Sequence, residues 1–449
     1  MAKVEHITEG PIYPTILRLA WPILAAMFLE FALSLANYFW VGFLGTAEQD
    51  AVTSSMVVTW TVYATISIIV IGITALVSRA IGAGEKERAA YVSKQGLLMA
   101  IGAGVFFSTL GIIASPHIMQ FLKAGPTVMK IGTPYLRIFF IGVGFFYIND
   151  AFGAIFRASG DTRSPMYSYI SATILNIILD PLLIFGIGPF PKMGVPGAAI
   201  ATVISIFAGF LIFIGLILKK KLEFSLGGWY RIKPDFKMMA KIFKIGIPIS
   251  IQNIIFTCVY WFIIQIVHRF GSPAGAAMGI GNRMESLSFL ISFGFSVAAS
   301  TLVGQNLGAE KPDRAAKCAW ATVKLIALET GLVSTIFLTI PGVITGAFTS
   351  DPAVHVIARD YLIILGLSQV FMGIEIVLEG SFSGAGNTLP PMIVSIPFSI
   401  ARLPLAYFLC FSLNIGINGV WWTLTITSFF KAIILFFWFR KGNWKKKKL

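Results

Sequence analysis

Gly160-Asp161-Thr162-Arg163-Ser164-Pro165-Met166 is the stretch from which the fold can be inferred. It returns later in the chain as Gly386-Asn387-Thr388-Leu389-Pro390-Pro391-Met392. Several shorter motifs return at the same spacing, so residues 22–166 match residues 248–392 without an insertion. A tandem repeat of this length predicts two lobes that share one order of elements.

The composition is that of a membrane protein. Of the 449 residues, 56% are hydrophobic and only 12% are charged, and the mean hydropathy is +0.82. Apolar stretches of about 20 residues can cross a bilayer core of roughly 30 Å, and backbone polar groups inside lipid require helices. Twelve such stretches occur, at 16–44, 51–78, 92–115, 132–157, 164–187, 195–218, 239–268, 275–303, 316–340, 357–383, 390–413 and 416–439. The sequence therefore predicts an all-α polytopic membrane protein of twelve transmembrane helices.

The repeat divides these helices into two six-helix lobes. We expect an N-terminal lobe over residues 1–218, a cytoplasmic linker over 219–238, a C-terminal lobe over 239–440 and a basic cytoplasmic tail over 441–449. The linker is rich in lysine and glycine, which interrupts the apolar pattern. Because six is an even number, both lobes enter the membrane from the same side, and the internal repeat is parallel. Parallel repeats of apolar spans are typical of transporters.

The basic residues are unevenly distributed along the chain. The 35 Lys and Arg against 20 Asp and Glu give a formal charge of +15. If the N-terminus is cytoplasmic, most of them lie on that side, and the opposite loops contain only Lys123, Lys130, Lys192 and Arg269. The positive-inside rule therefore predicts an inner-membrane protein with both termini in the cytoplasm. We expect the basic tail to contact anionic membrane lipid rather than nucleic acid.

Two stretches resemble the multidrug and toxic compound extrusion (MATE) family: Gly279-Ile280-Gly281-Asn282-Arg283-Met284-Glu285 and Thr301-Leu302-Val303-Gly304-Gln305-Asn306-Leu307-Gly308-Ala309. Residues 175–186 resemble the fifth helix of the prokaryotic branch in which an acid of the N-terminal lobe carries coupling. The resemblance implies an antiporter that exports organic cations or other amphipathic drugs in exchange for Na⁺ or H⁺. It also implies an aspartate fifteen residues after Pro22, where this chain has Asn37.

Asp180 is the main candidate for the coupling acid. It lies four residues after Asn176, so both side chains share one face of a helix. Carboxylate and amide oxygens suit Na⁺, and a carboxylate in a low dielectric can instead carry a proton. Asn37 and Asp180 lie at similar depths on helices that run in the same direction, so we expect them to meet inside the first lobe. The alternative interpretation is a hydrogen-bonded pair that only holds the lobe together.

Glu30 is a second acid within a predicted span. It precedes Asn37 by seven residues, which returns it to nearly the same helical face about two turns deeper. One hypothesis is that Glu30 supplies the carboxylate that Asn37 lacks. The other is that Glu30 lines a wet cavity and attracts a cationic substrate without coupling. Charges inside spans are costly, so each requires a partner or a purpose.

The second lobe is not expected to be a functional copy of the first. At the repeat spacing, Arg402 replaces Asn176 and Ala406 replaces Asp180. A positive charge therefore stands where the first lobe has its candidate cation site. We expect coupling in the first lobe only.

Three other acids are candidates for a substrate cavity. Glu375 and Glu379 lie one turn apart, and they either receive a cationic substrate or pair with Arg402 and cytoplasmic lysines. Glu285 belongs to the family-like stretch, where it either faces the cavity or braces Arg283 or a neighbouring helix. Charge and helical spacing alone leave both interpretations open for each acid.

Two further residues have predicted roles. Pro22 should bend the first helix, because it removes a backbone hydrogen bond and clashes with the preceding turn. Tyr38 is a candidate for cation–π contact with a flat organic cation. We find no ATP-binding motif, no metal-ligand cluster and no catalytic triad, which favours an ion-driven transporter over an enzyme with a cofactor.

Three alternatives and an oligomeric state complete the predictions. A lipid-linked precursor flippase of the same wider superfamily would need a cationic cavity for pyrophosphate, and the acids in the spans argue against it. A membrane-embedded enzyme would need catalytic groups clustered at one interface, and a passive channel would not need the asymmetry at Arg402. We expect a monomer that works by alternating access between its lobes.

Overall fold

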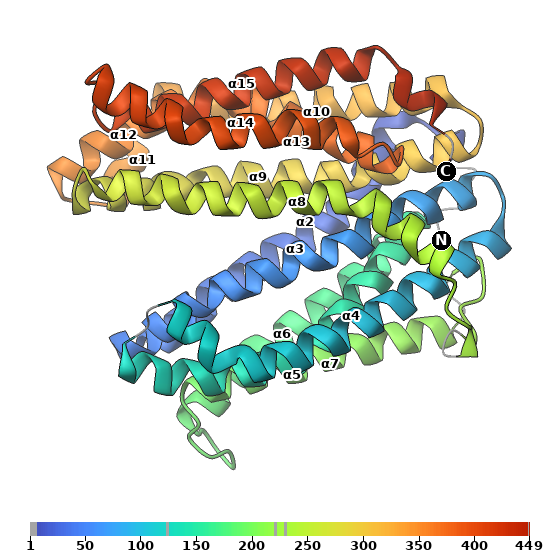
Figure 1. Cartoon of the computed structure of the whole chain (residues 1–449), viewed down its shortest axis with the longest axis horizontal. Helices are drawn as coiled ribbons and strands as arrows, with labels where there is room; N and C mark the ends of the chain where they lie inside the picture. Colours follow the sequence, from blue (N-terminus) through green and yellow to red (C-terminus); the bar gives the residue numbers. More distant parts are fainter. Residues whose placement is uncertain (1–6, 123–124, 220–221, 229–230, 448) are drawn as a thin grey trace. The chain divides into compact units, whose positions relative to one another are not determined.

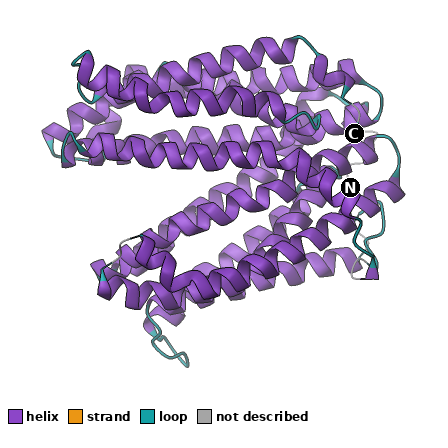
Figure 2. Cartoon of the chain, in the orientation of Figure 1, coloured by secondary structure: helices purple, strands orange, loops and turns teal. Residues whose placement is uncertain are grey.

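The computed structural model describes residues 7–122, 125–219, 222–228, 231–447 and 449. Within these ranges, the side chains of six helical residues lie outside the description: Leu35, Tyr38, Thr46, Met56, Val57 and Trp60. Among the described residues every regular element is a helix, and no strand occurs (Figure 2). The all-α fold class is confirmed.

The helices repeat at the spacing of the sequence motifs (Figure 1). The first half contains α2 (Ile12–Gly42), α3 (Thr46–Gly82), α4 (Lys86–Phe121), α5 (Pro126–Ala158), α6 (Arg163–Phe185) and α7 (Val195–Leu218). The second half contains α8 (Phe236–His268), α9 (Ser272–Gly308), α10 (Pro312–Thr339), α11 (Pro341–Gly346), α12 (Pro352–Gly366), α13 (Gln369–Gly384), α14 (Leu389–Tyr407), the π-helix η2 (Phe408–Ser412) and α15 (Asn418–Arg440). Both ends of α3 and α9 are separated by the spacing that relates Gly160 to Gly386, so the two halves share one register.

The last helix of each half has a slightly shorter spacing. Gly197 in α7 corresponds to Gly419 in α15, and the difference arises because the preceding loop is longer in the first half. A Cβ on Gly197 would lie 2.6 Å from the carbonyl oxygen of Leu183, and one on Gly419 would lie 2.9 Å from the carbonyl carbon of Leu409. Leu409 is the repeat counterpart of Leu183. Both glycines thus allow the same close approach of the last helix to the preceding one.

Eleven helices in the described residues are long and apolar enough to cross a membrane, and a bent pair can form one more span. The bent pair is α12 and α13, which meet at 53° and together replace the single helix α5 of the first half. At the break, Ser368 donates its hydroxyl to the carbonyl of Leu365 at 3.0 Å, so this side chain competes for a backbone acceptor. Counting the pair as one span agrees with the twelve predicted spans.

The chain folds into two compact units that differ from the sequence halves in two short segments. Unit 1 contains residues 21–246, and unit 2 contains the described residues up to Ala20 together with residues 247–449. The beginning of α2 therefore belongs to unit 2, and the beginning of α8 belongs to unit 1. In both helices the change of unit falls within two residues of a repeated proline, Pro22 or Pro248.

Each initial segment is anchored by an acid at an equivalent repeat position. In unit 2, Lys311 donates to Glu9 at 2.9 Å, and this hydrogen bond and charge hold the pKa of Glu9 below its ordinary value. In unit 1, the Tyr91 hydroxyl donates to Asp235 at 2.7 Å, and this hydrogen bond holds the pKa of Asp235 below its ordinary value. Glu9 and Asp235 are separated by the repeat spacing, so the anchoring is part of the repeat.

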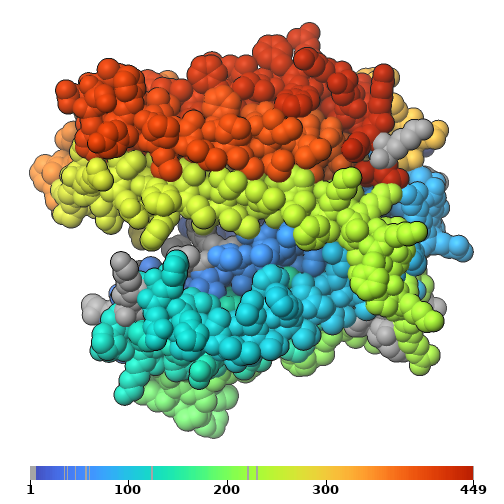
Figure 3. All heavy atoms as spheres, in the orientation of Figure 1, coloured from blue at the N-terminus to red at the C-terminus, as the bar shows by residue number. Residues whose placement is uncertain are grey.

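One helix organises the interior of each unit. α5 packs against α3, α4, α6 and α7 in unit 1, and α13 packs against α9, α10, α14 and α15 in unit 2. By contrast, α8 is visible along most of its length in the space-filling view (Figure 3), and its exposed side chains include Ile254, Trp261 and Phe262. An exposed apolar helix surface of this kind suits contact with lipid.

Candidate functional site

A chain of polar side chains links three helices inside unit 1. The amide nitrogen of Asn37, in α2, donates to the amide oxygen of Asn176, in α6, at 3.5 Å. The amide nitrogen of Asn176 donates to the hydroxyl of Thr202, in α7, at 3.4 Å. Both distances are at the long end for hydrogen bonds. Asn37 was expected to meet Asp180, but its described hydrogen bond is with Asn176, one turn earlier on α6, and that contact is loose.

Asp180 lies one turn further along α6 and is fully buried. Neither of its carboxyl oxygens has a hydrogen-bond partner in the described part of the chain. Tyr135, in α5, is near enough to interact electrostatically with it. Pro181 follows directly, and because its nitrogen carries no hydrogen, the carbonyl of Ile177 lacks its usual helical donor. A buried carboxylate without a donor is expensive, so the fold holds Asp180 in place at a cost.

Acceptor atoms outnumber donors in this N-lobe site, which we define as Asn37, Asn176, Asp180 and Thr202. The side-chain oxygen of Asn37 is buried without a partner among the described residues, as are both oxygens of Asp180. No basic side chain bonds to any of the four in the described part. Carboxylate, amide and hydroxyl oxygens are the ligands that hard cations prefer. The arrangement can therefore accept a small cation or a proton.

Glu30 belongs to a different group of side chains in unit 1. Its carboxylate is exposed and accepts a hydrogen bond of 2.9 Å from Tyr63, whose ring packs edge-on against Phe146 at 4.6 Å between centroids. The charge of Asp150 acts on Glu30, and Asp150 accepts a hydrogen bond of 2.9 Å from Tyr169. The described hydrogen bond of Glu30 is thus with α3, and that of Asn37 is with α6.

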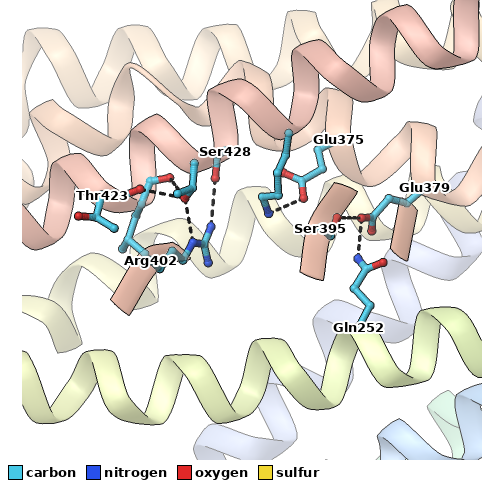
Figure 4. A network of polar contacts seen from close by, with 10 residues as sticks. Gln252, Glu375, Glu379, Ser395, Arg402, Thr423 and Ser428 are labelled. Carbon is cyan, nitrogen blue, oxygen red and sulfur yellow. Dashed lines mark hydrogen bonds and ion pairs between the residues drawn. The ribbon is translucent and has the colours of Figure 1, made fainter. Parts of the chain in front are cut away.

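Unit 2 contains a larger polar network among α8, α13, α14 and α15 (Figure 4). Lys431 Nζ lies 2.5 Å from Glu375 Oε1, and the two side chains are only 6% and 9% exposed. Glu379, one turn away on α13, accepts hydrogen bonds from Gln252 at 2.6 Å and from Ser395 at 2.9 Å. Every carboxylate of this network therefore has a donor.

Arg402 forms the other end of the network in Figure 4. Its guanidinium donates to the hydroxyls of Thr427 at 2.9 Å and Ser428 at 3.4 Å, and it lies 5.5 Å from the centroid of the Phe256 ring. Glu375 acts on Arg402 through charge alone. One alternative from the sequence was that Glu375 and Glu379 pair with Arg402 and cytoplasmic lysines. Glu375 instead pairs with Lys431 inside the last span of unit 2, and Glu379 bonds to neutral side chains.

Glu285 is held by a neighbouring helix. The hydroxyl of Tyr361, in α12, lies 3.2 Å from Glu285 and 2.9 Å from Asn282. The contact corresponds to the bracing role that the sequence left open, and the partner is Tyr361 rather than Arg283. Tyr361 is also the repeat counterpart of Tyr135, so the same helix position lies near an acid in each unit.

The two repeats are also what a known family shares with this chain. The MatE family model matches residues 22–182 and 248–408. The chain belongs to the MATE family. The probable multidrug resistance protein NorM of Thermotoga maritima is 31% identical over 447 residues, which cover 99% of this chain and 95% of that relative. The FAD transporter of Shewanella oneidensis is 28% identical over 446 residues, with 97% and 96% covered.

Solved structures share the fold. A transporter of the MOP superfamily from Pyrococcus furiosus superposes with a TM-score of 0.90 at 23% identity, covering 100% of this chain and 99% of that one. The resemblance inferred from the quoted motifs is thereby confirmed, as is the two-lobe fold. Members of the MATE family are multi-pass membrane transporters, and this chain is one of them.

The sequence did not point to two residues that the MATE fold brings into these sites. Thr202 could not be singled out, because threonines are frequent in apolar helices and its contact with Asn176 depends on how α7 packs on α6. Lys431 had a signal, since it is the only charged residue of the predicted span 416–439. The side chain of Tyr38, predicted to contact substrate, lies outside the described part.

Proposed function

We propose that this MATE transporter is an antiporter that exports organic cations in exchange for Na⁺ or H⁺ bound at the N-lobe site. The observation that carries the proposal is the excess of buried acceptor oxygens on Asn37 and Asp180. Buried acceptors without donors are destabilising unless something positive joins them. A cation or proton taken from the medium meets that requirement, and the lobe has no internal substitute among its described residues.

The coupling follows from a difference in affinity between two states. A bound ion shifts a conformational equilibrium only if it binds one state more tightly than the other. The contacts of 3.5 Å and 3.4 Å that link Asn37, Asn176 and Thr202 leave room for shorter contacts to form around an ion. Binding would draw α2, α6 and α7 together, and release would loosen them. Occupancy of the N-lobe site thereby shifts the conformational equilibrium of unit 1.

Glu30 is proposed as a substrate contact rather than as the missing coupling carboxylate. Its exposed position beside Tyr63 and Phe146 combines a negative charge with two aromatic rings. Such a surface attracts flat organic cations through charge and cation–π contact. Glu30 bonds to Tyr63 of α3, whereas Asn37 bonds to Asn176 of α6, which supports different roles for Glu30 and Asp180.

The unit 2 network supports this substrate class over a lipid pyrophosphate. Lys431 is neutralised by Glu375, and Arg402 is within the influence of both Glu375 and Glu285. These bases therefore do not form the uncompensated cationic cavity that a pyrophosphate would need. The distribution of basic residues favours an inner-membrane protein with both termini in the cytoplasm. We propose that it acts as a monomer, since the repeat places both lobes in one chain.

Transport in liposomes tests the proposal. Purified protein would be reconstituted, and uptake of a fluorescent organic cation such as ethidium would be followed under separately imposed Na⁺ and pH gradients. Uptake should depend on one of these gradients and should be lost in Asp180→Asn. The exposed Asp50→Asn on α3 is the matched control, because it makes the same chemical change outside the site. Uptake driven by neither gradient, or full coupling in Asp180→Asn, would overturn the proposal.

A further inference from the structure

The ion pair between Lys431 and Glu375 occupies positions whose repeat counterparts carry no charge. Asn149 is the counterpart of Glu375, and Gly209 is the counterpart of Lys431 at the shorter spacing that relates Gly197 to Gly419 in the last helices. In unit 1 these counterparts also face each other, since a Cβ on Gly209 would lie 3.3 Å from the amide nitrogen of Asn149. The same contact between a central helix and a last helix is thus neutral in one unit and ionic in the other.

The two neighbouring carboxylates of α13 face two bases only because Lys431 is present. Glu375 and Glu379 are one turn apart on α13, and Lys431 lies directly against Glu375 and also acts on Glu379. Arg402 is the other base that acts on Glu375. The contacts of Glu379 itself are with the neutral side chains of Gln252 and Ser395. Without Lys431, two neighbouring carboxylates in a low-dielectric interior would face a single guanidinium that is hydrogen-bonded to hydroxyls.

We infer that Lys431 is a tethered cation that fills a second ion site in unit 2, and that it thereby limits the transporter to one coupling ion. This inference rests on the proposed coupling at Asp180. A lysine ammonium supplies one positive charge on a flexible stem, which is what an exchangeable cation would supply to Glu375. Because it is covalently attached, it cannot leave during transport. Lys431 thus determines the number of ions and does not itself carry coupling.

A purely structural ion pair would behave differently on removal of the lysine. Truncating one member of a buried pair leaves the other charge uncompensated and destabilises the protein. If the pair is only structural, added cation should not repair the loss. If Lys431 occupies an ion site, the vacated position should be open to Na⁺ or a proton, and binding to the folded state should restore stability by mass action.

Cation binding to the purified full-length protein tests this inference. Equilibrium binding of radioactive Na⁺ and proton uptake in Na⁺-free buffer would be measured in detergent for four proteins: wild type, Asp180→Asn, Asp180→Asn/Lys431→Gln, and Asp180→Asn/Lys431→Gln/Glu375→Gln. We expect the wild type to bind one cation and Asp180→Asn to bind none. Adding Lys431→Gln should restore one equivalent, and adding Glu375→Gln should abolish it again.

The outcomes separate the inference from the function on which it depends. If Asp180→Asn binds as much cation as the wild type, the proposed coupling site is wrong. If Asp180→Asn abolishes binding but Lys431→Gln does not restore it, the tethered-cation inference is overturned. If the variant carrying Lys431→Gln does not fold, Lys431→Met would be prepared at high Na⁺ and at low pH. Recovery of folded protein that depends on either cation supports the inference, and recovery from neither condition overturns it.

Discussion

The two units share one order of spans but treat one buried acid each, Asp180 and Glu375, in opposite ways. In unit 1, Asp180 is fully buried with no hydrogen-bond partner among the described residues. In unit 2, Glu375 is almost as deeply buried but holds Lys431 at 2.5 Å. The carboxylate of Asp180 has no described partner and can accept a cation from outside the chain, whereas the carboxylate of Glu375 is paired with a base of the same unit. If the proposed function holds, the comparison teaches that a duplicated fold can keep its packing while only one copy has an ion site.

The largest expected effect is the loss of stability when the ion pair between Lys431 and Glu375 in unit 2 is broken. Lys431→Met should destabilise the protein by about 3–5 kcal/mol, because it leaves Glu375 buried and uncompensated. Unfolding in detergent, followed by heat or denaturant in a buffer that lacks Na⁺ at neutral pH, measures the change. The double variant Glu375→Gln/Lys431→Met should recover most of the loss. A loss below about 1 kcal/mol for the single variant would place this pair with weak surface ion pairs and contradict the comparison.

In unit 1, the change Asp180→Asn should not destabilise the protein, in contrast to Lys431→Met in unit 2. Because no described donor is lost and a buried charge is removed, the melting temperature in the absence of Na⁺ should be unchanged or higher. Stabilisation by added cation should disappear at the same time. A substantial fall in melting temperature would show that Asp180 is a structural residue with an internal partner, as Glu375 is.

Glu30→Gln sharpens the division of roles within unit 1. If Glu30 contacts an organic cation, losing its charge should weaken substrate binding by about 1 kcal/mol, the upper end of the range for exposed charge pairs. Dependence of transport on the ion gradient should persist. Binding of a fluorescent cation and gradient-driven uptake measure the two properties separately. Loss of ion dependence with unchanged substrate affinity would reverse the assignment and return Glu30 to the coupling site.

Two hydroxyls on the last helices test the comparison at finer scale. Thr202→Val removes an acceptor for Asn176 with almost no change of shape, and should weaken binding of the coupling cation by about 1 kcal/mol, or roughly fivefold. Ser428→Ala removes an acceptor for Arg402 in unit 2 and should leave cation affinity unchanged. Radioactive Na⁺ binding or proton uptake provides the measurement. Equal effects of the two changes would mean that both units share in ion binding.

The smallest expected effect concerns the anchored initial segments. The pKa of Asp235 is lowered by its hydrogen bond from Tyr91, so ionised Asp235 stabilises the folded state. This stabilisation is fully present above the ordinary carboxyl pKa of about 4 and is lost as the pH falls through the lower folded value. Melting temperatures of the wild type and Asp235→Asn should therefore differ slightly at neutral pH and converge on acidification. Glu9→Gln should behave alike through Lys311, and a difference that grows on acidification would contradict the assignment.

Much of the fold could be predicted because repetition and hydropathy act along the chain. The spacing of Gly160 and Gly386 predicted the common register of the helices, and the apolar stretches predicted their number. The break between α12 and α13 was not predicted, since residues 357–383 form one largely apolar stretch and the local competition at Ser368 is visible only in its contacts. Hydropathy shows how much of the chain is apolar, but it does not show where a span bends.

The sequence predicted the relations between site residues that share a helix, but not those that depend on packing between helices. Asn176 and Asp180 share a helix, so their common face followed from helical geometry alone. The proposed link between Glu30 and the same site also relied on helical spacing, but the contacts of Glu30 depend on Tyr63 in α3. Helical spacing tells which residues share a face, and only packing between helices tells which neighbour that face meets.

By itself, the sequence determined that this protein is a duplicated bundle of membrane-spanning helices with few charges, and that the counterpart of Asp180 is Ala406. Those properties depend on residue type and spacing, which need no knowledge of contacts between helices. Only the tertiary structure decided that Asp180 has no internal donor among the described residues and that Lys431 reaches Glu375. The reason is that compensation of a buried charge acts over a few ångströms, between residues that the chain places far apart.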